Sequence, residues 1–201
     1  MDHGMKTYIL DGIWGWHSRW EGLRQRIETT LGACEIWRYD NSGHTSLEVV
    51  GARLREELGR SKTPVNLVGY SMGGLVIREA LRGTEDLLVR RAAFLHCPHR
   101  GSLAAHTLRL PACREMRPGS AFLKRLNESP WSIPALATWC AWDAVILPGH
   151  SGRWDRATTL IKSHVPAHAW PVISPGLHRA VIDFLAADSS PPGSARIRGV
   201  L

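Results

Sequence analysis

Long hydrophobic runs are absent from this sequence. No apolar stretch approaches the roughly 20 residues that a membrane-spanning helix requires. The first residues lead directly into Thr-Tyr-Ile-Leu at positions 7–10, and they contain no apolar segment of the kind found in secretory signal peptides. We therefore expect a cytoplasmic protein that does not insert into a membrane.

Closely spaced cysteines are also missing. The four cysteines form no Cys-x-x-Cys pair, and their separations are not those of a metal site. They are Cys34, Cys97, Cys113 and Cys140. We expect reduced, mostly buried thiols, and the sequence predicts neither a bound metal nor a cofactor.

Basic clusters are the third absence. The formal net charge is +7, yet the arginines are dispersed and no basic block is interleaved with aromatic residues. The sequence therefore does not predict a nucleic-acid partner. A dispersed positive charge favours solubility and allows peripheral attraction to anionic surfaces.

The composition that is present is typical of one globular domain. The chain has 201 residues, of which 44% are hydrophobic and 21% charged, and it shows no internal repeat. Strand-like and helix-like segments alternate, which favours an α/β domain. The expected strands are residues 8–10, 34–39, 65–68, 92–96, 135–139 and 158–162. The expected helices are residues 20–31, 47–58, 73–81, 102–110, 121–126 and 177–185. We assign residues 1–188 to this single domain and residues 189–201, which begin Ser-Ser-Pro-Pro-Gly-Ser, to a flexible tail.

The motif that carries most chemical information is Gly-Tyr-Ser-Met-Gly at residues 69–73. It follows the apolar run 65–68 and precedes the expected helix, which is the strand–turn–helix context of a nucleophilic serine. Glycines let the two chain segments pass closely, and a strained turn holds the serine oxygen clear of the backbone. The helix N-terminus favours a developing oxyanion. We therefore interpret Ser71 as a nucleophile.

A nucleophilic serine needs an acid that orients its base. In folds with this kind of serine, the acid and then the base follow it along the chain, on loops at the carboxyl edge of the sheet. Asp143 lies just after an expected strand and is the candidate acid. Asp155 lies in a polar stretch typical of a solvated turn, and Asp183 lies within the last helix.

The candidate base is His168. It follows the last expected strand and precedes the final helix, where the base belongs. His164 lies four residues earlier on the same loop and is the alternative, whereas His178 falls inside the helix.

An oxyanion hole requires two backbone N–H groups. One belongs to the residue after the nucleophile, Met72, and the other to the loop after an early strand. Residues 11–15, Asp-Gly-Ile-Trp-Gly, form that loop. Ile13 is the candidate for the second donor and Trp14 the alternative.

Five segments beyond the serine motif resemble, in order, those of the small lipase and esterase branch of the α/β-hydrolases. This branch includes bacterial triacylglycerol lipases and the inositol-deacylase-like group. Residues 11–15 resemble its His-Gly-x-x-Gly oxyanion loop, with Asp11 at the histidine position. Residues 95–102 resemble its Thr-Pro-His-x-Gly-Ser loop, with Cys97 at the threonine position. The others are residues 116–127, the acid loop 142–148, and His168 with the Ser-Pro at 174–175.

The resemblance spans residues 7–186 and implies a compact α/β-hydrolase fold with a mostly parallel sheet, helices on both faces and a short or absent lid. It implies the catalytic residues Ser71, His168 and Asp143, and it makes His99 a structural residue near the site. Asp11 is a departure that would bring negative charge near the oxyanion, although its carboxylate could brace the loop through backbone N–H groups.

The expected activity is hydrolysis of a small-molecule or lipid acyl ester through an acyl-enzyme. Residues 103–134, where a lid or acyl pocket would be built, are few, so we expect an open cleft that favours small or medium acyl groups. The alternatives are a thioesterase, a phospholipid deacylase, an acyltransferase, or a fold that has lost catalysis and serves as a binding protein.

Overall fold

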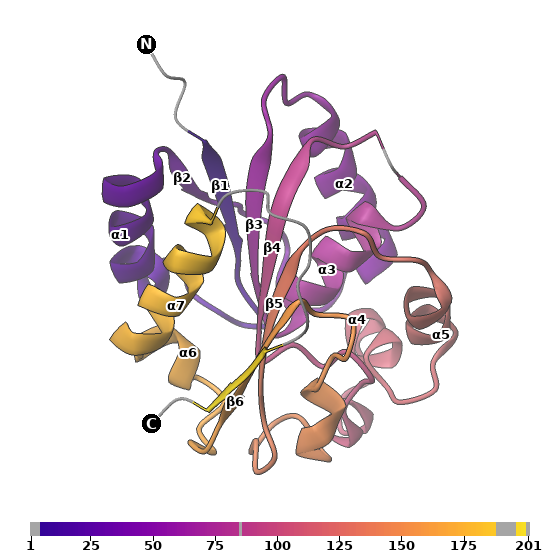
Figure 1. Ribbon diagram of the computed structural model, residues 1–201. Helices are drawn as coiled ribbons and strands as arrows, with labels where there is room; N and C mark the ends of the chain where they lie inside the picture. The colour runs from indigo at the N-terminus through magenta and orange to yellow at the C-terminus, as the bar shows by residue number, and fades with distance from the viewer. Residues whose placement is uncertain (1–4, 85, 188–195, 200–201) are drawn as a thin grey trace.

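A central sheet with helices on both faces dominates the computed structural model, which describes residues 5–84, 86–187 and 196–199 (Figure 1). The sheet has the strand order β2-β1-β3-β4-β5-β6-β7, and all neighbouring strands are parallel. The strands are β1 (Lys6–Leu10), β2 (Cys34–Ile36), β3 (Val65–Tyr70), β4 (Val89–Leu95), β5 (Ala135–Cys140), β6 (Thr159–Ser163) and β7 (Arg196–Gly199).

The helices fall into α-helices and short 3-10 helices. The α-helices are α1 (Glu21–Leu31), α2 (Leu47–Gly59), α3 (Met72–Leu81), α4 (Pro111–Glu115), α5 (Ala121–Glu128), α6 (Trp170–Ile173) and α7 (Pro175–Ala186). The 3-10 helices are η1 (His17–Trp20), η2 (Leu103–His106) and η3 (Gly149–Gly152). Together with the parallel sheet, this arrangement confirms the expected α/β fold class.

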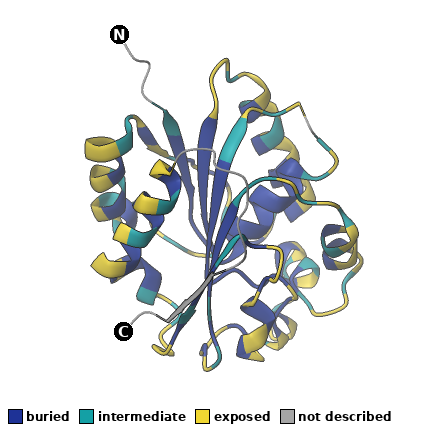
Figure 2. Cartoon of the chain, viewed as in Figure 1, coloured by how far each residue is buried: buried dark blue, intermediate teal, exposed yellow. Residues whose placement is uncertain are grey.

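Two hydrophobic cores hold the layers together. On one face, residues of η1, α1 and α7 pack on the sheet, with Trp20, Ile27 and Leu185 fully buried. On the other face, α2 and α3 share a core with α4 and α5. Figure 2 shows the strands buried between these layers, while the outward faces of α1 and α7 are exposed.

The local sequence explains the central elements. All six residues of β3 are buried, as expected for a parallel strand covered on both faces. In α2, buried residues recur every three or four positions, and Ser46 caps the helix by accepting a hydrogen bond from the N–H of Val49 at 3.3 Å. Ser174 caps α7 in the same way through the N–H of Leu177.

The structure corrects the helix expected at residues 102–110. Only Leu103–His106 are helical there, as η2, and a separate helix, α4, begins at Pro111. The cause is the proline, because its ring disfavours helical dihedrals in the preceding residue and suits the first turn of a new helix. Leu110 accordingly adopts extended dihedrals of −72° and 146°.

Of the predicted tail, residues 189–201, the structure describes residues 196–199. Arg196–Gly199 form β7, which pairs with β6 at the edge of the sheet. The rest of the stretch 189–201 lies outside the described residues.

The parallel sheet brings distant chain segments to one edge. Because every strand runs in the same direction, the loops that follow them emerge together. Ser71 directly follows β3, His96 directly follows β4, and Asp143 and His168 lie on the loops after β5 and β6. The chemistry-bearing residues are therefore concentrated at the carboxyl edge.

The four cysteines are buried and unpaired, in agreement with the expectation of free thiols. Among the described residues, no helix combines the length and the hydrophobicity that crossing a membrane would demand.

Candidate active site

Ser71 occupies a strained turn between β3 and α3. Its φ of 50° and ψ of −123° lie where non-glycine residues are rare. The neighbouring glycines are required by space: a Cβ on Gly73 would lie 2.5 Å from the carbonyl oxygen of Leu10, and one on Gly69 would lie 2.6 Å from the Cα of Gly74. Strain of this kind costs on the order of 1–3 kcal/mol and persists where the surrounding packing enforces it.

Ser71, His168 and Asp143 form a continuous hydrogen-bonded chain. His168 Nε2 lies 3.0 Å from Ser71 Oγ, and His168 Nδ1 lies 2.9 Å from Asp143 Oδ2 and 3.1 Å from Oδ1. The hydroxyl of Tyr70 donates to the carbonyl oxygen of His168 at 3.1 Å, and the Tyr70 ring packs against the imidazole. The structure thus brings together the three side chains selected from the sequence.

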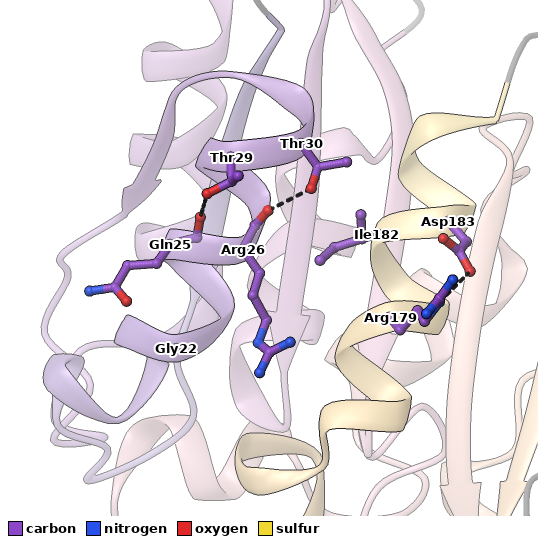
Figure 3. Close-up of a pocket in the computed structure, with 8 residues that line it drawn as sticks. All are labelled: Gly22, Gln25, Arg26, Thr29, Thr30, Arg179, Ile182 and Asp183. Carbon is purple, nitrogen blue, oxygen red and sulfur yellow. Dashed lines mark hydrogen bonds and ion pairs between the residues drawn. The ribbon is translucent and has the colours of Figure 1, made fainter.

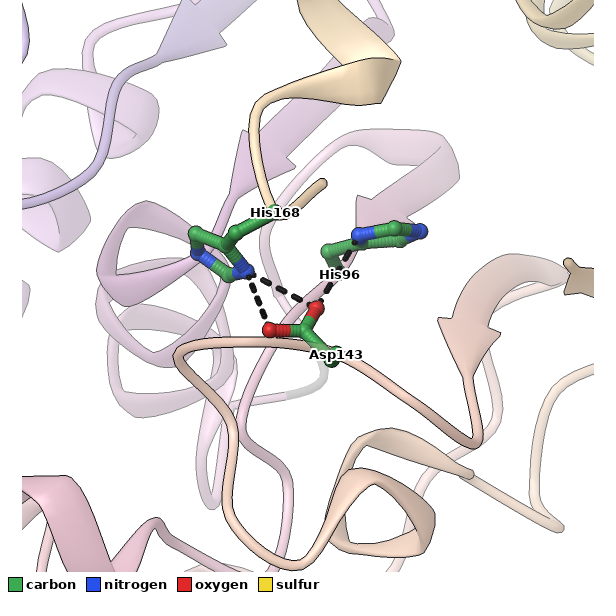
Figure 4. Close-up of side chains that lie close together, drawn as sticks. All are labelled: His96, Asp143 and His168. Atoms are coloured by element: carbon green, nitrogen blue, oxygen red, sulfur yellow. Dashed lines mark hydrogen bonds and ion pairs between the residues drawn. The ribbon is translucent and has the colours of Figure 1, made fainter. Parts of the chain in front are cut away.

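Asp143 is buried and held from several sides (Figure 4). Its Oδ1 accepts the N–H groups of Val145 and Ile146, each at 2.8 Å. Burial by itself would raise the pKa of this carboxyl, but the imidazoles of His168 and His96 and the backbone N–H groups outweigh burial and hold the pKa well below its usual range. Asp143 is therefore ionised at neutral pH.

The alternative acids and base lie elsewhere. His164 is exposed on the loop after β6. Asp155 is exposed and pairs with Arg100 and Arg153. Asp183 lies on α7, exposed beside Arg179.

Among the residues described, the backbone N–H groups of the two candidate oxyanion donors, Met72 and Ile13, are free, whereas that of the alternative donor, Trp14, is not. Met72 is the first residue of α3, and the first N–H groups of a helix have no partner within it. The N–H of Trp14 donates to the carbonyl oxygen of Asn41 at 2.9 Å, so it is occupied. Within the described part of the chain, the N–H of Ile13 makes no hydrogen bond. Its loop passes close to the nucleophile, since a Cβ on Gly12 would lie 2.9 Å from that of Ser71.

Similarity to known proteins identifies the family of this chain. A model of the alpha/beta hydrolase family matches residues 3–197. The chain belongs to the alpha/beta hydrolase family. Among curated proteins, the comparison finds no match.

Solved structures similar to this hydrolase share its fold at low sequence identity. The lin2722 gene product of Listeria innocua is 12% identical with a TM-score of 0.70, covering 96% of this chain and 98% of that chain. Lipase B of Aspergillus fumigatus is 11% identical with a TM-score of 0.72, covering 93% and 53%. The propeptide form of Bacillus licheniformis lipase BlEst2 is 18% identical with a TM-score of 0.70, covering 98% and 53%. This hydrolase therefore spans about half the length of those two lipases.

In this hydrolase the carboxylate of Asp11 braces the loop after β1. It accepts the N–H of Gly12 at 2.7 Å and pairs with the guanidinium of Arg19, whose Nε lies 2.9 Å from Oδ2. The amide of Asn41 adds hydrogen bonds to the carbonyl oxygens of Gly12 and Gly15. Arg19 thus supplies the positive charge that offsets Asp11 near the candidate oxyanion site.

Replacing Asp11 with asparagine is expected to lower the free energy of unfolding by about 3 kcal/mol, because Arg19 would keep a largely buried charge without its partner. Urea denaturation measures this change. The matched control is Glu56→Gln, which breaks an exposed pair with Arg60 and should cost less than about 1 kcal/mol. Equal losses in the two variants would contradict a bracing role for Asp11.

His99 lies within a buried structural cluster. Its ring stacks on Trp154 with centroids 4.7 Å apart, and Arg78 Nη1 approaches its Nδ1 at 3.4 Å. Burial, reinforced by the charge of Arg78, lowers the pKa of His99 well below its usual range, so the imidazole is neutral. Arg78 also donates to the carbonyl oxygen of Leu126 at 2.8 Å, which ties α3 to the end of α5.

His96 was not singled out by sequence reasoning. It is fully buried, adopts a φ of 43°, and places its Nδ1 3.2 Å from Asp143 Oδ2 (Figure 4). The side chains of His96, Asp143 and His168 have ligand atoms within 4.8 Å of one another, and both imidazoles lie directly against the carboxylate. The available sequence signal was the position of His96 at the end of a strand, at the carboxyl edge. The chain has ten histidines, and this position alone did not distinguish His96 from the others.

A surface hollow between α1 and α7 lies apart from this chemistry (Figure 3). Gly22, Gln25, Arg26, Thr29, Thr30, Arg179, Ile182 and Asp183 line it. The hydroxyls of Thr29 and Thr30 are hydrogen-bonded to backbone carbonyl oxygens of their own helix. None of the lining residues belongs to the group around Ser71.

Proposed function

We propose that this hydrolase cleaves carboxylic esters through an acyl-enzyme intermediate. The observation that carries the proposal is the unbroken hydrogen-bonded chain from Ser71 Oγ through His168 to Asp143. His168 removes the proton from Ser71 as its oxygen attacks the acyl carbonyl carbon, and then donates that proton to the leaving alcohol. Asp143 holds the imidazole tautomer and stabilises its protonated form.

Backbone N–H groups at the turn between β3 and α3 and on the loop after β1 stabilise the negative charge that develops on the substrate oxygen. The N–H groups of Met72 and Ile13 donate to the oxyanion of the tetrahedral intermediate. In deacylation, His168 activates a water molecule that attacks the acyl-enzyme and frees Ser71. This cycle uses a serine, a histidine, an aspartate and main-chain amides, and it requires no cofactor.

Apolar side chains on the loops of the carboxyl edge favour an ester with hydrophobic parts. Trp14 and Trp142 are 59% and 78% exposed, and they follow β1 and β5. Leu103 and Leu147 are also exposed and lie on adjacent loops, joined by a hydrogen bond from the N–H of Leu103 to the carbonyl oxygen of Leu147. Exposed hydrophobic groups at the edge of the sheet that carries Ser71 suit an acyl chain or an apolar alcohol.

The segment that could cover the serine is packed into the core. Residues of α4 and α5, including Cys113, Phe122 and Leu126, are buried in the same cluster as α2 and α3. This packing leaves few residues for a mobile lid, which supports an open cleft and small or medium acyl groups.

A series of p-nitrophenyl esters tests the proposal. We expect hydrolysis of the acetate, butyrate and octanoate with a higher kcat/KM than the palmitate, because a shallow cleft buries little of a long chain. Thioesters of the same acyl groups and a phospholipid, assayed in parallel, distinguish the thioesterase and phospholipid deacylase alternatives. Preferential cleavage of long-chain triglyceride emulsions would contradict the open cleft.

Labelling with a fluorophosphonate probe distinguishes an active serine hydrolase from a protein that has the same fold but serves only as a binding protein. The folded protein should be labelled at Ser71, as located by peptide mass analysis, because only an activated serine reacts quickly with the probe. Heat-denatured protein is the control. Absence of labelling would favour a fold that has lost catalysis.

A further inference from the structure

His96 approaches the carboxylate of Asp143 from the side opposite to the backbone donors. Its Nδ1 lies 3.2 Å from Oδ2, while the N–H groups of Val145 and Ile146 bind Oδ1. His168 Nδ1 lies within 3.1 Å of both oxygens. Two imidazoles therefore approach Oδ2, whereas Oδ1 accepts two backbone amides and also lies 3.1 Å from the imidazole of His168.

The imidazole of His96 has no other polar contact to satisfy it. The ring is fully buried, and within the described residues neither of its nitrogens makes a hydrogen bond; Nδ1 only lies at ion-pair distance, 3.2 Å, from Asp143 Oδ2. The aromatic rings around it are those of His168, at 5.9 Å between centroids, and Trp170, at 6.1 Å. A buried imidazole without hydrogen-bond partners is energetically unfavourable, so its orientation toward Asp143 requires a structural or functional explanation.

The backbone of His96 is held in an unfavourable conformation to achieve this contact. Its φ of 43° is in the left-handed region, which a side chain other than glycine rarely adopts. The N–H of His96 is fixed to β5 by the hydroxyl of Thr138 at 3.0 Å and the carbonyl oxygen of Thr138 at 3.2 Å. Strained residues of this kind collect at functional sites, where the surrounding structure enforces them.

We propose that His96 is a positioning residue that holds the carboxylate of Asp143 in the orientation needed to bind His168. The proposal rests on the ester-hydrolase function proposed above. With its proton on Nδ1, His96 presents that N–H toward Oδ2 at 3.2 Å while the two backbone amides hold Oδ1, and together these groups restrain the carboxylate from rotating away from the imidazole of His168. The charged or titratable groups that face His96 are Asp143, from the loop after β5, and His168, from the loop after β6.

Two substitutions separate positioning from packing. His96→Gly removes the ring and tolerates a positive φ, whereas His96→Asn also tolerates it and keeps an N–H donor at the place of Nδ1. We expect the glycine variant to lose kcat by about 10-fold on a soluble aryl ester, with KM changed less than about twofold, because Asp143 is misaligned in the transition state. The asparagine variant should recover most of this loss.

The pH profile of kcat/KM gives a readout that packing alone would not move. Without His96, the carboxylate of Asp143 turns away from protonated His168, and the imidazolium loses part of the stabilisation that this negative charge provides. The base must be neutral to act, and the acid limb of the glycine variant is therefore expected to move to lower pH. The asparagine variant should keep the limb of the unmodified protein.

The matched control is His99→Asn, a buried histidine on the same loop that contacts Trp154 and Arg78 and lies outside the Asp143 cluster. It should keep kcat within about twofold of the unmodified protein, even if its Tm falls. If the glycine variant is unfolded in thermal melting, His96→Leu replaces it, since leucine fills the space without a donor.

Three results overturn the proposal: a folded donor-free variant with unchanged kcat, an unchanged acid limb in that variant, or an asparagine variant no better than the donor-free one. Failure of the unmodified protein to hydrolyse any ester or react with fluorophosphonate would instead reject the proposed function, and the two failures are therefore distinguishable.

Discussion

Replacing Ser71 with alanine is expected to lower the turnover of a short-chain aryl ester by about 10⁴-fold or more, while the protein remains folded. The proposed reaction begins with attack by the Ser71 oxygen, and among the described residues Ser71 Oγ is the hydroxyl that His168 Nε2 contacts, at 3.0 Å. The remaining rate would come from substrate binding and the backbone donors, which act without the serine. Initial rates with p-nitrophenyl butyrate, together with a thermal melt, measure this effect.

Ser151→Ala is the matched control for that experiment. Ser151 is also a buried serine at the carboxyl edge, in η3, and within the described part of the chain only its backbone makes hydrogen bonds. Its alanine variant should keep activity within about twofold. Undiminished turnover in Ser71→Ala would exclude Ser71 as the nucleophile.

The His168→Gln variant is expected to show the second large effect, a loss of kcat on the order of 10⁴-fold. Glutamine can occupy the same space, but it cannot accept the proton of Ser71 or pass it to the leaving alcohol. Its kcat on the same ester, measured from pH 6 to 9, should remain low throughout, because no higher pH restores a base at this position.

His164→Gln provides the comparison for His168. His164 is exposed on the same loop, so its substitution changes one histidine four residues away without touching Ser71 or Asp143. We expect its kcat to stay within about twofold of the unmodified protein. A large loss in His164→Gln with little change in His168→Gln would reverse the assignment of the base.

Local sequence patterns were sufficient for most of the sheet and its long helices. The apolar run before Ser71 predicted β3, and the spacing of Leu47, Val50, Leu54 and Leu58 predicted α2, because burial on one or two faces imposes those periods. The patterns failed at residues 102–110, where the effect of Pro111 on its neighbour divides the segment. They also did not predict β7, a short edge strand that depends on pairing with β6.

Part of the candidate site could be predicted from the sequence. Ser71 could be selected because its glycine neighbours and flanking elements are contiguous in the chain. Its position before the final helix favoured His168 as the base, but His164 stayed the alternative because both histidines lie on the loop after β6. In the structure, His168 is the one within hydrogen-bond distance of Ser71.

The sequence by itself determined the alternating α/β architecture, the serine turn and the order of acid and base, because each depends on residues that are adjacent or regularly spaced. The tertiary structure decided what depends on contacts across the sheet. It paired Asp11 with Arg19, so that the carboxylate on the candidate oxyanion loop is neutralised and braces the loop. It also brought His96 against Asp143, through the parallel alignment of β4 and β5 that sets their ends side by side.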